Sequence, residues 1–250
     1  MDTVSLQLTE DGSHTLYNKE LNETYHSTNG AIAEAEYVFI RSGLDAQLAN
    51  CADSLAILEV GFGTGLNTLM TLGHICERRA TECLPEIRYV SLEPFPIDSG
   101  VIARLNYPAL LPRLYQSLFT QIHHAAWDQP TQLQTGFSFT KANTTLESYC
   151  AAAGSFDLIY FDAFAPNKQP DVWRLSNFIK CFELLKPNGL LVSYCANGQF
   201  KRNLKAAGFT VKPHPGALGK REMTRAWKSN TADIAAVLND VTNSLGIYTE

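Results

Sequence analysis

The stretch LAILEVGFGTGLN, residues 55–67, decides the fold. A run of apolar residues of strand length ends in a turn with alternate glycines, Gly61, Gly63 and Gly65, and a helical pattern begins at Leu66. Glycines in such a turn let the backbone approach a ligand closely and direct the N–H groups of a helix N-terminus at it. The stretch predicts a strand, a ligand-binding turn and a helix, although a tight turn of this kind also occurs where no ligand binds.

Outward from this turn, strand and helix patterns alternate. Strand-like runs follow at IRYVSLEP, FSFTKAN, FDLIYFD and GLLVSYC, with helical patterns from Ile97, near Leu146, from Val172 and around Phe200. Such alternation predicts a mostly parallel sheet with helices on both faces. The last two strands, FTVKPHP and EMTRAWK, are joined by a short connection and must be antiparallel. We therefore expect an α/β fold with a seven-stranded sheet and an antiparallel terminal strand, which resembles the Rossmann-like arrangement of class I methyltransferases.

The beginning of the chain has a different pattern. VSLQLTEDGSHTLYN alternates apolar and polar residues on both sides of Asp11-Gly12, which predicts a β-hairpin. YHSTNGAIAEAEYVFIRSGL predicts a helix with its N-cap within residues 27–29 and Gly43 as its terminator. We expect residues 1–50 to form a hairpin and helix cap, and residues 51–250 to form the methyltransferase-like domain.

Polar side chains at the strand ends favour one cofactor over another. NAD is disfavoured, though it stays open, because the dinucleotide fingerprint needs a glycine or alanine where this chain has Leu66. Glu59, directly before the glycine turn, is expected to place a carboxylate near the mouth of the site, where it suits the ammonium and sulfonium of S-adenosylmethionine. Glu93 ends the next strand, where an acid can accept both hydrogen bonds of a ribose diol. Asn143 offers an amide to an adenine edge, although a solvated loop residue or helix cap is the common structural role of such a side chain.

The segment YFDAFAP, residues 160–166, raises the question of what its acid holds. Ligands of open α/β sheets lie beyond the carboxyl ends of the central strands, and Asp162 occupies that end of the fourth core strand. An acid there can orient an attacking amine and accept or share its proton. Phe164 and Pro166 would supply an apolar wall suited to stacking on a base. Capping of the following helix is the structural alternative, which the residues between Pro166 and Pro170 disfavour.

Composition limits the classes of function. The net charge of -5 gives no global attraction to nucleic acid, so an RNA partner requires a local basic patch. The six cysteines show no metal-ligand spacing, which predicts reduced structural thiols and no metal. The opening residues lack a signal-peptide pattern, and the apolar runs are of strand length. We expect a cytoplasmic protein that does not contact a membrane.

As a set, the motifs resemble those of the methyltransferase family that completes 5-methylaminomethyl-2-thiouridine at the wobble position of tRNA. The resemblance runs from about Tyr17 to Trp227 and rests on YHSTNGAIAEAEYVF, LEVGFGTGLN, LEPFP, FDAFAPNKQPDVW, LKPNGLLVSYCANGQFKRNLKAAGF and GKREM. It implies methylation by S-adenosylmethionine of the primary amine of 5-aminomethyl(-2-thio)uridine at position 34, with the anticodon region of tRNA as the partner. It also implies a stand-alone form, with a separate FAD-dependent or other enzyme acting earlier in the same pathway.

The resemblance implies roles for individual residues. Asp162 falls on the active-site acid of the family. The cofactor-contacting motifs fall on Glu59, Gly61, Gly63, Thr64, Gly65, Asn67, Glu93 and Asp162. Asn143 departs from the family, whose members often carry an acid at the adenine-binding position. Substrate contacts are expected from Tyr25, Phe164 and Pro166 at the entrance, and from Lys220 and Arg221 of GKREM on the RNA backbone.

Two other functions stay open. An aminopropyltransferase of the spermidine synthase type also pairs an N-terminal hairpin domain with this fold and an acid after the fourth core strand, although its glycine loop is usually richer in glycine and acids than GFGTG. The other is a non-catalytic RNA-binding module on a methyltransferase shell. The intact acids Glu59, Glu93 and Asp162 speak against such a decayed site.

Overall fold

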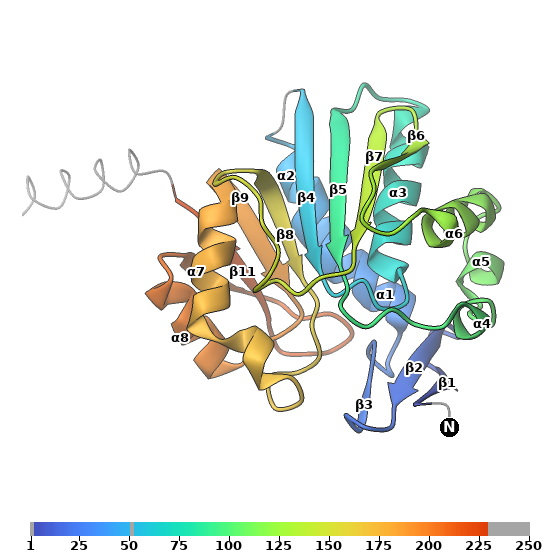
Figure 1. The fold of residues 1–250 in the computed structure, drawn as a ribbon, viewed down its shortest axis with the longest axis horizontal. Coiled ribbons are helices and arrows are strands. Elements are labelled where there is room, and N and C mark those ends of the chain that lie inside the picture. Colours follow the sequence, from blue (N-terminus) through green and yellow to red (C-terminus); the bar gives the residue numbers. More distant parts are fainter. Residues whose placement is uncertain (1–2, 51–52, 230–250) are drawn as a thin grey trace, which may run out of the picture.

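The central feature of the computed structural model, which describes residues 3–50 and 53–229, is one large sheet (Figure 1). Its eight strands lie in the order β10-β11-β9-β8-β4-β5-β7-β6. Their bounds are Ser54–Val60 (β4), Glu86–Leu92 (β5), Thr131–Gln134 (β6), Phe137–Ala142 (β7), Phe156–Phe161 (β8), Leu185–Ser193 (β9), Thr210–His214 (β10) and Met223–Trp227 (β11). Strands β7, β5, β4, β8 and β9 are mutually parallel, whereas β11 is antiparallel to both of its neighbours. The predicted α/β fold is confirmed.

Two expectations about the segments on either side of β7 are wrong. The sheet has eight strands rather than seven, because β6 pairs with β7 as an antiparallel hairpin whose turn contains Gly136 at φ 72°. The segment near Leu146 forms a turn over residues 146–148 rather than a helix. Its Leu146 side chain is buried in the core that the sheet shares with α7 (Leu175–Leu184).

Helices cover both faces of the sheet (Figure 1). One face packs against α1 (Ala31–Ala35), the π-helix η1 (Glu36–Leu44), α3 (Leu66–Arg79) and α6 (Leu114–His124), and the other face against α7 and α8 (Gly198–Ala206). Strand β4 shows how the sequence builds both layers. Leu55 and Ile57 enter one core, whereas Ala56 and Leu58 enter the other, because successive side chains of a strand point to opposite faces. The short elements are α2 (Asp45–Leu48), α4 (Ser99–Ile102), α5 (Tyr107–Leu110) and the 3₁₀ turn η2 (Pro170–Trp173).

The predicted hairpin is part of a small sheet beyond the carboxyl ends of the main strands (Figure 1). Strands β1 (Val4–Leu8) and β2 (His14–Asn18) pair antiparallel across the Asp11-Gly12 turn, and β3 (Glu23–Thr24) pairs with β2. This arrangement places the hairpin over the edge of the main sheet at which the glycine turn lies.

The helix that follows the hairpin begins at Ala31, and the hairpin turn binds its first N–H groups. Ser13 Oγ accepts a hydrogen bond from Ala31 N at 3.2 Å, and Asp11 Oδ2 accepts one from Ala33 N at 3.0 Å. Gly30 occupies the N-cap position without a side-chain cap. The local cap predicted within residues 27–29 is therefore wrong, because side chains distant in sequence satisfy these N–H groups.

Gly43 does not terminate this helix, which continues through η1 and α2 to Leu48. A Cβ atom on Gly43 would lie 3.0 Å from Val192 Cγ2 and 3.2 Å from Tyr160 Cε1. The glycine thus permits close approach of the helix to β8 and β9. The division of the chain at residue 50 stays a prediction.

The described residues contain neither a membrane-spanning helix nor a metal-binding cluster. No described helix is long and apolar enough to cross a bilayer. Within residues 3–50 and 53–229, His, Cys, Asp and Glu side chains form no cluster that could hold a metal ion. The free thiols there are Cys76, Cys83, Cys150, Cys181 and Cys195, and Cys51 lies outside the described residues.

Candidate active site

A cleft of about 1060 Å³ lies at the carboxyl ends of β4, β5 and β8. The glycine turn, the segment after β5 and the segment after β8 form its walls, and the small N-terminal sheet contributes Thr3, Val4 and Asn18. Six acidic side chains and one lysine line it: Glu20, Glu93, Asp98, Glu147, Asp162, Asp171 and Lys168. This excess of acids favours cationic ligand groups over phosphates.

The glycine turn passes between the ends of β5 and β8. Gly61 N and Phe62 N both donate to Leu92 O, at 3.0 and 3.1 Å. Gly61 has φ 99°, and a Cβ atom there would overlap the carbonyl oxygen of Asp162. Gly63 has φ 50° and faces Tyr25, whose Cδ1 would lie 3.1 Å from an added Cβ. Both glycines line the cleft. Because glycine has no side chain, the backbone itself forms the cleft wall at these two positions.

Buried polar contacts support the turn from beneath. Thr64 is fully buried, and its Oγ1 hydrogen bonds with His26 Nε2 at 2.7 Å and accepts from Tyr107 OH at 3.3 Å. Burial lowers the pKa of His26 to about 4, so the ring is neutral near pH 7. Gly65 is the left-handed N-cap of α3 at φ 75°. Thr64 and Gly65 therefore hold the turn against α3 and the N-terminal segment.

Glu59 lies behind the cleft wall rather than near the mouth, where the sequence suggested it. Its side chain is fully buried, and Oε2 accepts hydrogen bonds from Thr68 Oγ1 at 2.9 Å and from Ser91 Oγ. Burial raises the pKa of this carboxyl to about 7, although these hydroxyl groups oppose the shift. The carboxyl group joins β4, β5 and α3 beneath the glycine turn.

Glu93 lines the cleft as the sequence predicted. Oε2 accepts from Gly63 N at 3.0 Å and Oε1 accepts from Phe95 N at 2.9 Å. Burial raises the pKa of Glu93 despite these bonds. A carboxylate has about four lone-pair sites, so both oxygens keep capacity for the hydroxyl groups of a ligand.

Asn143 lies outside the cleft wall, contrary to the adenine contact that the sequence suggested. The residue is exposed, and its backbone N donates to Asp128 Oδ1 at 2.8 Å. The next residues, Thr144 and Thr145, line the cleft instead. Position along the chain could not resolve this one-residue difference, because the segment forms a turn rather than the expected helix.

Asp162 and Asn67 meet at the floor of the cleft. Asn67 Nδ2 donates to Asp162 Oδ2 at 2.7 Å, while no described residue bonds Asn67 Oδ1, which is buried. Burial raises the pKa of Asp162 well above its usual value, and the Asn67 hydrogen bond opposes that shift. Asp162 is therefore a basic carboxylate at the position predicted for the acid, and Asn67 is its nearest polar support.

Two aromatic rings form the wall beside Asp162. Tyr25 and Phe164 pack edge to face with their centroids 4.7 Å apart, and both line the cleft. The Phe164 backbone is fixed by Trp173 Nε1, which donates to its carbonyl oxygen at 2.8 Å, and by Gln169 Oε1, which accepts from its N–H at 3.2 Å. Pro166 lies in the same loop but outside the residues that line the cleft. Of the expected wall of Phe164 and Pro166, only Phe164 lines the cleft, and Tyr25 packs beside it.

The two residues expected on the RNA backbone point in different directions. Lys220 Nζ donates to Glu34 Oε1, and Glu34 is 7% exposed. Arg221 is exposed. Glu34 could not be identified as the partner of Lys220 from the sequence, where its one distinguishing feature is its place on the polar side of the helix in AIAEAEYVF.

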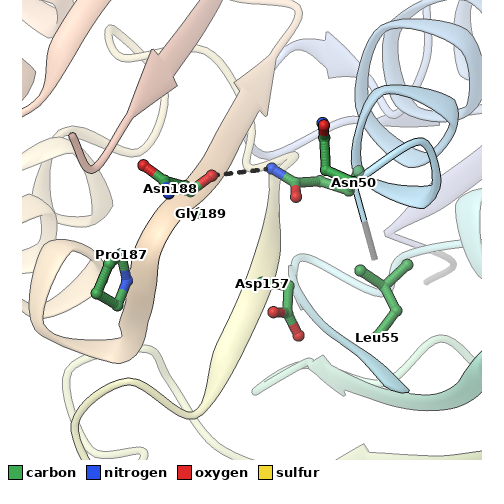
Figure 2. Close-up of a pocket in the computed structure, with 7 residues that line it drawn as sticks. Asn50, Leu55, Asp157, Pro187, Asn188 and Gly189 are labelled. Atoms are coloured by element: carbon green, nitrogen blue, oxygen red, sulfur yellow. Dashed lines mark hydrogen bonds between the residues drawn. The ribbon is translucent and has the colours of Figure 1, made fainter. Parts of the chain in front are cut away.

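A second hollow, of about 370 Å³, lies at the opposite edge of the sheet (Figure 2). It is lined by Gln47, Asn50, Leu55, Asp157, Pro187, Asn188 and Gly189. Asp157 Oδ2 accepts from Ala56 N and from Lys186 Nζ, both at 2.8 Å. This carboxylate ties the start of β4 to β8 and β9.

The chain resembles known proteins in sequence. Residues 114–229 match the model of a family described as S-adenosyl-L-methionine-dependent methyltransferase. The chain is 31% identical over 229 residues to the tRNA 5-methylaminomethyl-2-thiouridine biosynthesis bifunctional protein MnmC of Ralstonia nicotianae, and 30% identical over 230 residues to the protein of that name from Burkholderia thailandensis. Each match covers 88% of this chain but 34% of the relative, so the chain spans about one third of the length of these curated proteins.

Solved structures share its fold. The crystal structure of MnmC2 from Aquifex aeolicus has a TM-score of 0.73 at 24% identity, over 94% of this chain and 75% of that chain. Spermidine synthase from Thermotoga maritima has a TM-score of 0.50 at 15% identity, over 92% of this chain and 74% of that chain. At such identities the likeness shows the fold alone. S-adenosylmethionine is the cofactor of the family whose model matches the chain. Residues 114–229 thus resemble the S-adenosyl-L-methionine-dependent methyltransferase family in sequence, and the chain shares the fold of MnmC2.

Proposed function

We propose that this protein transfers a methyl group from S-adenosylmethionine to the 5-aminomethyl group of (2-thio)uridine at wobble position 34 of tRNA, giving 5-methylaminomethyl-(2-thio)uridine. The observation that carries the proposal is Asp162 at the floor of an acid-rich cleft, beside the aromatic pair Tyr25 and Phe164. The names of the MnmC relatives support the substrate class. Methylation of tRNA also implies a cytoplasmic enzyme, with an FAD-dependent or other enzyme acting earlier on the same nucleotide.

The residues of the cleft fit S-adenosylmethionine. Glu93 presents two carboxylate oxygens with spare lone pairs for a ribose diol, and Gly61 and Gly63 leave backbone room along the wall. Asn67 is buried behind this wall, where its amide donates to Asp162 Oδ2 at 2.7 Å. When bound there, S-adenosylmethionine supplies an electrophilic methyl group on a sulfonium. Thr144 and Thr145 line the cleft where the sequence placed the adenine contact, so we assign that role to them in place of Asn143.

Asp162 has two tasks toward the amine. An aliphatic amine is mostly an ammonium at neutral pH, and the acidic cleft attracts that cation. An ammonium has no lone pair, so a proton must leave nitrogen before nitrogen can attack. Burial raises the pKa of Asp162, which makes the carboxylate a better proton acceptor than an exposed aspartate. Asn67 fixes Oδ2 and thereby orients the carboxylate toward the cleft.

The aromatic pair would hold the uracil ring. Phe164 is anchored through both of its backbone polar groups, so its ring has a fixed place beside Asp162. Tyr25 packs against it, and burial raises the pKa of Tyr25 to about 12, which keeps the phenol neutral. Stacking on such rings is tolerant of the base and contributes about 1–3 kcal/mol per base. Arg221, which is exposed, is the residue of GKREM best placed to contact phosphate.

The test is methyl transfer in vitro. The purified chain is incubated with methyl-labelled S-adenosylmethionine and tRNA that carries 5-aminomethyl-2-thiouridine at position 34, and the digested nucleosides are analysed by mass spectrometry. We expect labelled 5-methylaminomethyl-2-thiouridine, and no label in tRNA that lacks the aminomethyl group. A parallel reaction with decarboxylated S-adenosylmethionine and putrescine tests the aminopropyltransferase alternative. Aminopropyl transfer without methylation of tRNA would contradict the proposal.

A further inference from the structure

Lys220 forms an ion pair with a buried acid. Its Nζ donates to Glu34 Oε1, and the other carboxylate oxygen of Glu34 accepts from Ser27 N at 3.0 Å. The side chain of Glu34 is 9% exposed and that of Lys220 is 37% exposed. The Lys220 ammonium is thus engaged by an acid of the protein although its side chain is partly exposed, whereas Arg221 next to it is exposed.

The backbone around Lys220 is fixed by tight packing of the loop between β10 and β11. Lys220 N donates to Ala217 O at 2.9 Å, and Ala217 is buried. A Cβ atom on Gly216 would overlap the carbonyl oxygen of Lys220. The position of the ammonium is therefore determined by the loop as well as by the flexible side chain.

A chain of contacts connects this ion pair to Asp162. Lys220 Nζ lies 5.6 Å from the centroid of the Tyr194 ring, which places the cation over the ring. Tyr194 OH donates to Ala163 O at 2.9 Å, and Ala163 directly follows Asp162. The loop between β10 and β11 thus reaches the residue that follows the proposed active-site acid through one tyrosine.

We propose that Lys220, paired with Glu34, is a positioning residue for methyl transfer: the pair holds Tyr194 against the Ala163 carbonyl oxygen beside Asp162 and supplies the positive charge that favours the Asp162 carboxylate. This inference rests on the proposed function. Lys220 would then support the active site and would not make the contact with the RNA backbone that its motif had suggested.

The charged groups around Asp162 shift its pKa in opposite directions. Burial raises the pKa of Asp162, the acids Glu34 and Glu59 raise it further, and Lys220 lowers it. Tyr194 also faces this group, with Glu23 and Cys195 near Tyr194. Removal of the Lys220 charge should raise the pKa of Asp162, whereas removal of the Glu34 charge should lower it. A purely structural role would not give opposite directions.

The experiment compares four single variants: Lys220→Met, Lys220→Arg, Glu34→Gln and the matched control Lys205→Met. Single-turnover methyl transfer is measured against pH with saturating tRNA and S-adenosylmethionine. We expect Lys220→Met to slow the reaction roughly 10-fold, the scale of a modest misplacement, and to move the rise in rate to higher pH. Glu34→Gln should move it to lower pH, and Lys220→Arg should restore most of the rate. Lys205→Met removes an exposed lysine of α8 and should leave both the saturating rate and its pH dependence unchanged.

A second readout does not depend on activity. In protein labelled with 13C-aspartate, the carboxyl carbon of Asp162, identified by its absence in Asp162→Asn, should titrate at higher pH in Lys220→Met than in the wild type. If Lys220→Met does not fold, Lys220→Gln removes the charge and keeps a donor for Glu34. An inactive wild type would refute the proposed function, while the titration would still decide whether Lys220 acts on Asp162. An unchanged titration, or a higher KM for tRNA with a normal saturating rate in Lys220→Met, would overturn the inference.

Discussion

Asp162 and Asp157 lie at opposite ends of strand β8 and differ in their hydrogen-bond partners. Asp157, beside the small hollow of Figure 2, accepts from a backbone N–H and from the ammonium of Lys186. Asp162, in the large cleft, accepts from the neutral amide of Asn67, and burial raises its pKa. The first carboxylate is stabilised by the protein itself. The second accepts no hydrogen bond from a charged group of the described residues and keeps the capacity to bind the cation of a ligand.

The same contrast extends to neighbouring groups. Near the cleft, the buried atoms Glu59 Oε1 and Asn67 Oδ1 have no hydrogen-bond partner in the described part of the chain. Leaving such a group unpaired costs about 1–3 kcal/mol, so folds retain it where a ligand or water satisfies it. At the other edge, Gln47 Nε2 donates to Asn188 O at 3.3 Å. The buried atoms Tyr89 OH, His123 Nε2 and Arg225 Nε also have no partner in the described part of the chain, so the contrast between the two ends of the strands rests on the partners of Asp162 and Asp157.

The largest effect should come from Asp162→Asn, which keeps the shape of the side chain and removes its charge. We expect turnover to fall by roughly 10²-fold or more, the usual scale for a positioned acid or base. Affinity for S-adenosylmethionine should stay within about 5-fold, because Glu93 and the glycine turn are intact. Single-turnover assays and calorimetry measure the two quantities. Turnover near that of the wild type would show that Asp162 is structural, like Asp157.

Glu59→Gln should change how stability depends on pH. The folded-state pKa of Glu59 is raised from 4.5 to about 7, so the folded protein binds this proton more tightly than the unfolded chain. The free energy of unfolding should therefore fall as pH rises from 4.5 through 7, by about 2–3 kcal/mol from this group. Denaturant unfolding of both proteins across that range measures the difference, and the fall should be smaller in Glu59→Gln. Parallel curves would refute the burial account of Glu59.

Glu93→Ala should weaken binding of S-adenosylmethionine by about 1–3 kcal/mol through loss of hydrogen bonds to a charged acceptor. Asn143→Ala is the matched control, because it changes a polar side chain at the end of the neighbouring strand but outside the cleft. Its affinity should match that of the wild type. Calorimetry on the three proteins gives the comparison, and equal losses in both variants would restore the adenine contact to Asn143.

Asp157→Asn should have the smallest effect, and only on stability. Weakened bonds to Ala56 N and Lys186 should lower the free energy of unfolding by about 1–2 kcal/mol, while cofactor affinity and turnover stay unchanged. Denaturant unfolding and single-turnover assays measure these quantities. A loss of turnover without a loss of stability would place function at the wrong edge of the sheet.

The fold could be predicted because its signals are local. The apolar runs and the glycine turn mark strands and turns within a few residues of sequence, and the short connection before EMTRAWK required an antiparallel end. The errors came from long-range contacts. The helix from Ala31 takes its N-terminal bonds from Ser13 and Asp11, and Gly43 serves its packing on the sheet.

The candidate site divided in the same way. Asp162 and Glu93 could be placed because the ends of parallel strands meet at one edge. The sequence does not show to which side of its strand the Glu59 side chain points. Glu59 was therefore expected at the mouth of the cleft, whereas it is buried behind the cleft wall. Lys220 followed from its motif, but its partner Glu34 is 186 positions away in sequence, and only the fold brings the two together.

The central claim is most directly tested by nucleoside mass spectrometry of tRNA from cells that lack this protein. The cells are complemented with the wild type, Asp157→Asn or Asp162→Asn at matched protein levels. The account predicts that 5-aminomethyl-type uridines accumulate without the protein, that the wild type and Asp157→Asn restore 5-methylaminomethyl-type uridines, and that Asp162→Asn does not. An unchanged nucleoside profile in cells lacking the protein, or full restoration by Asp162→Asn, would contradict it.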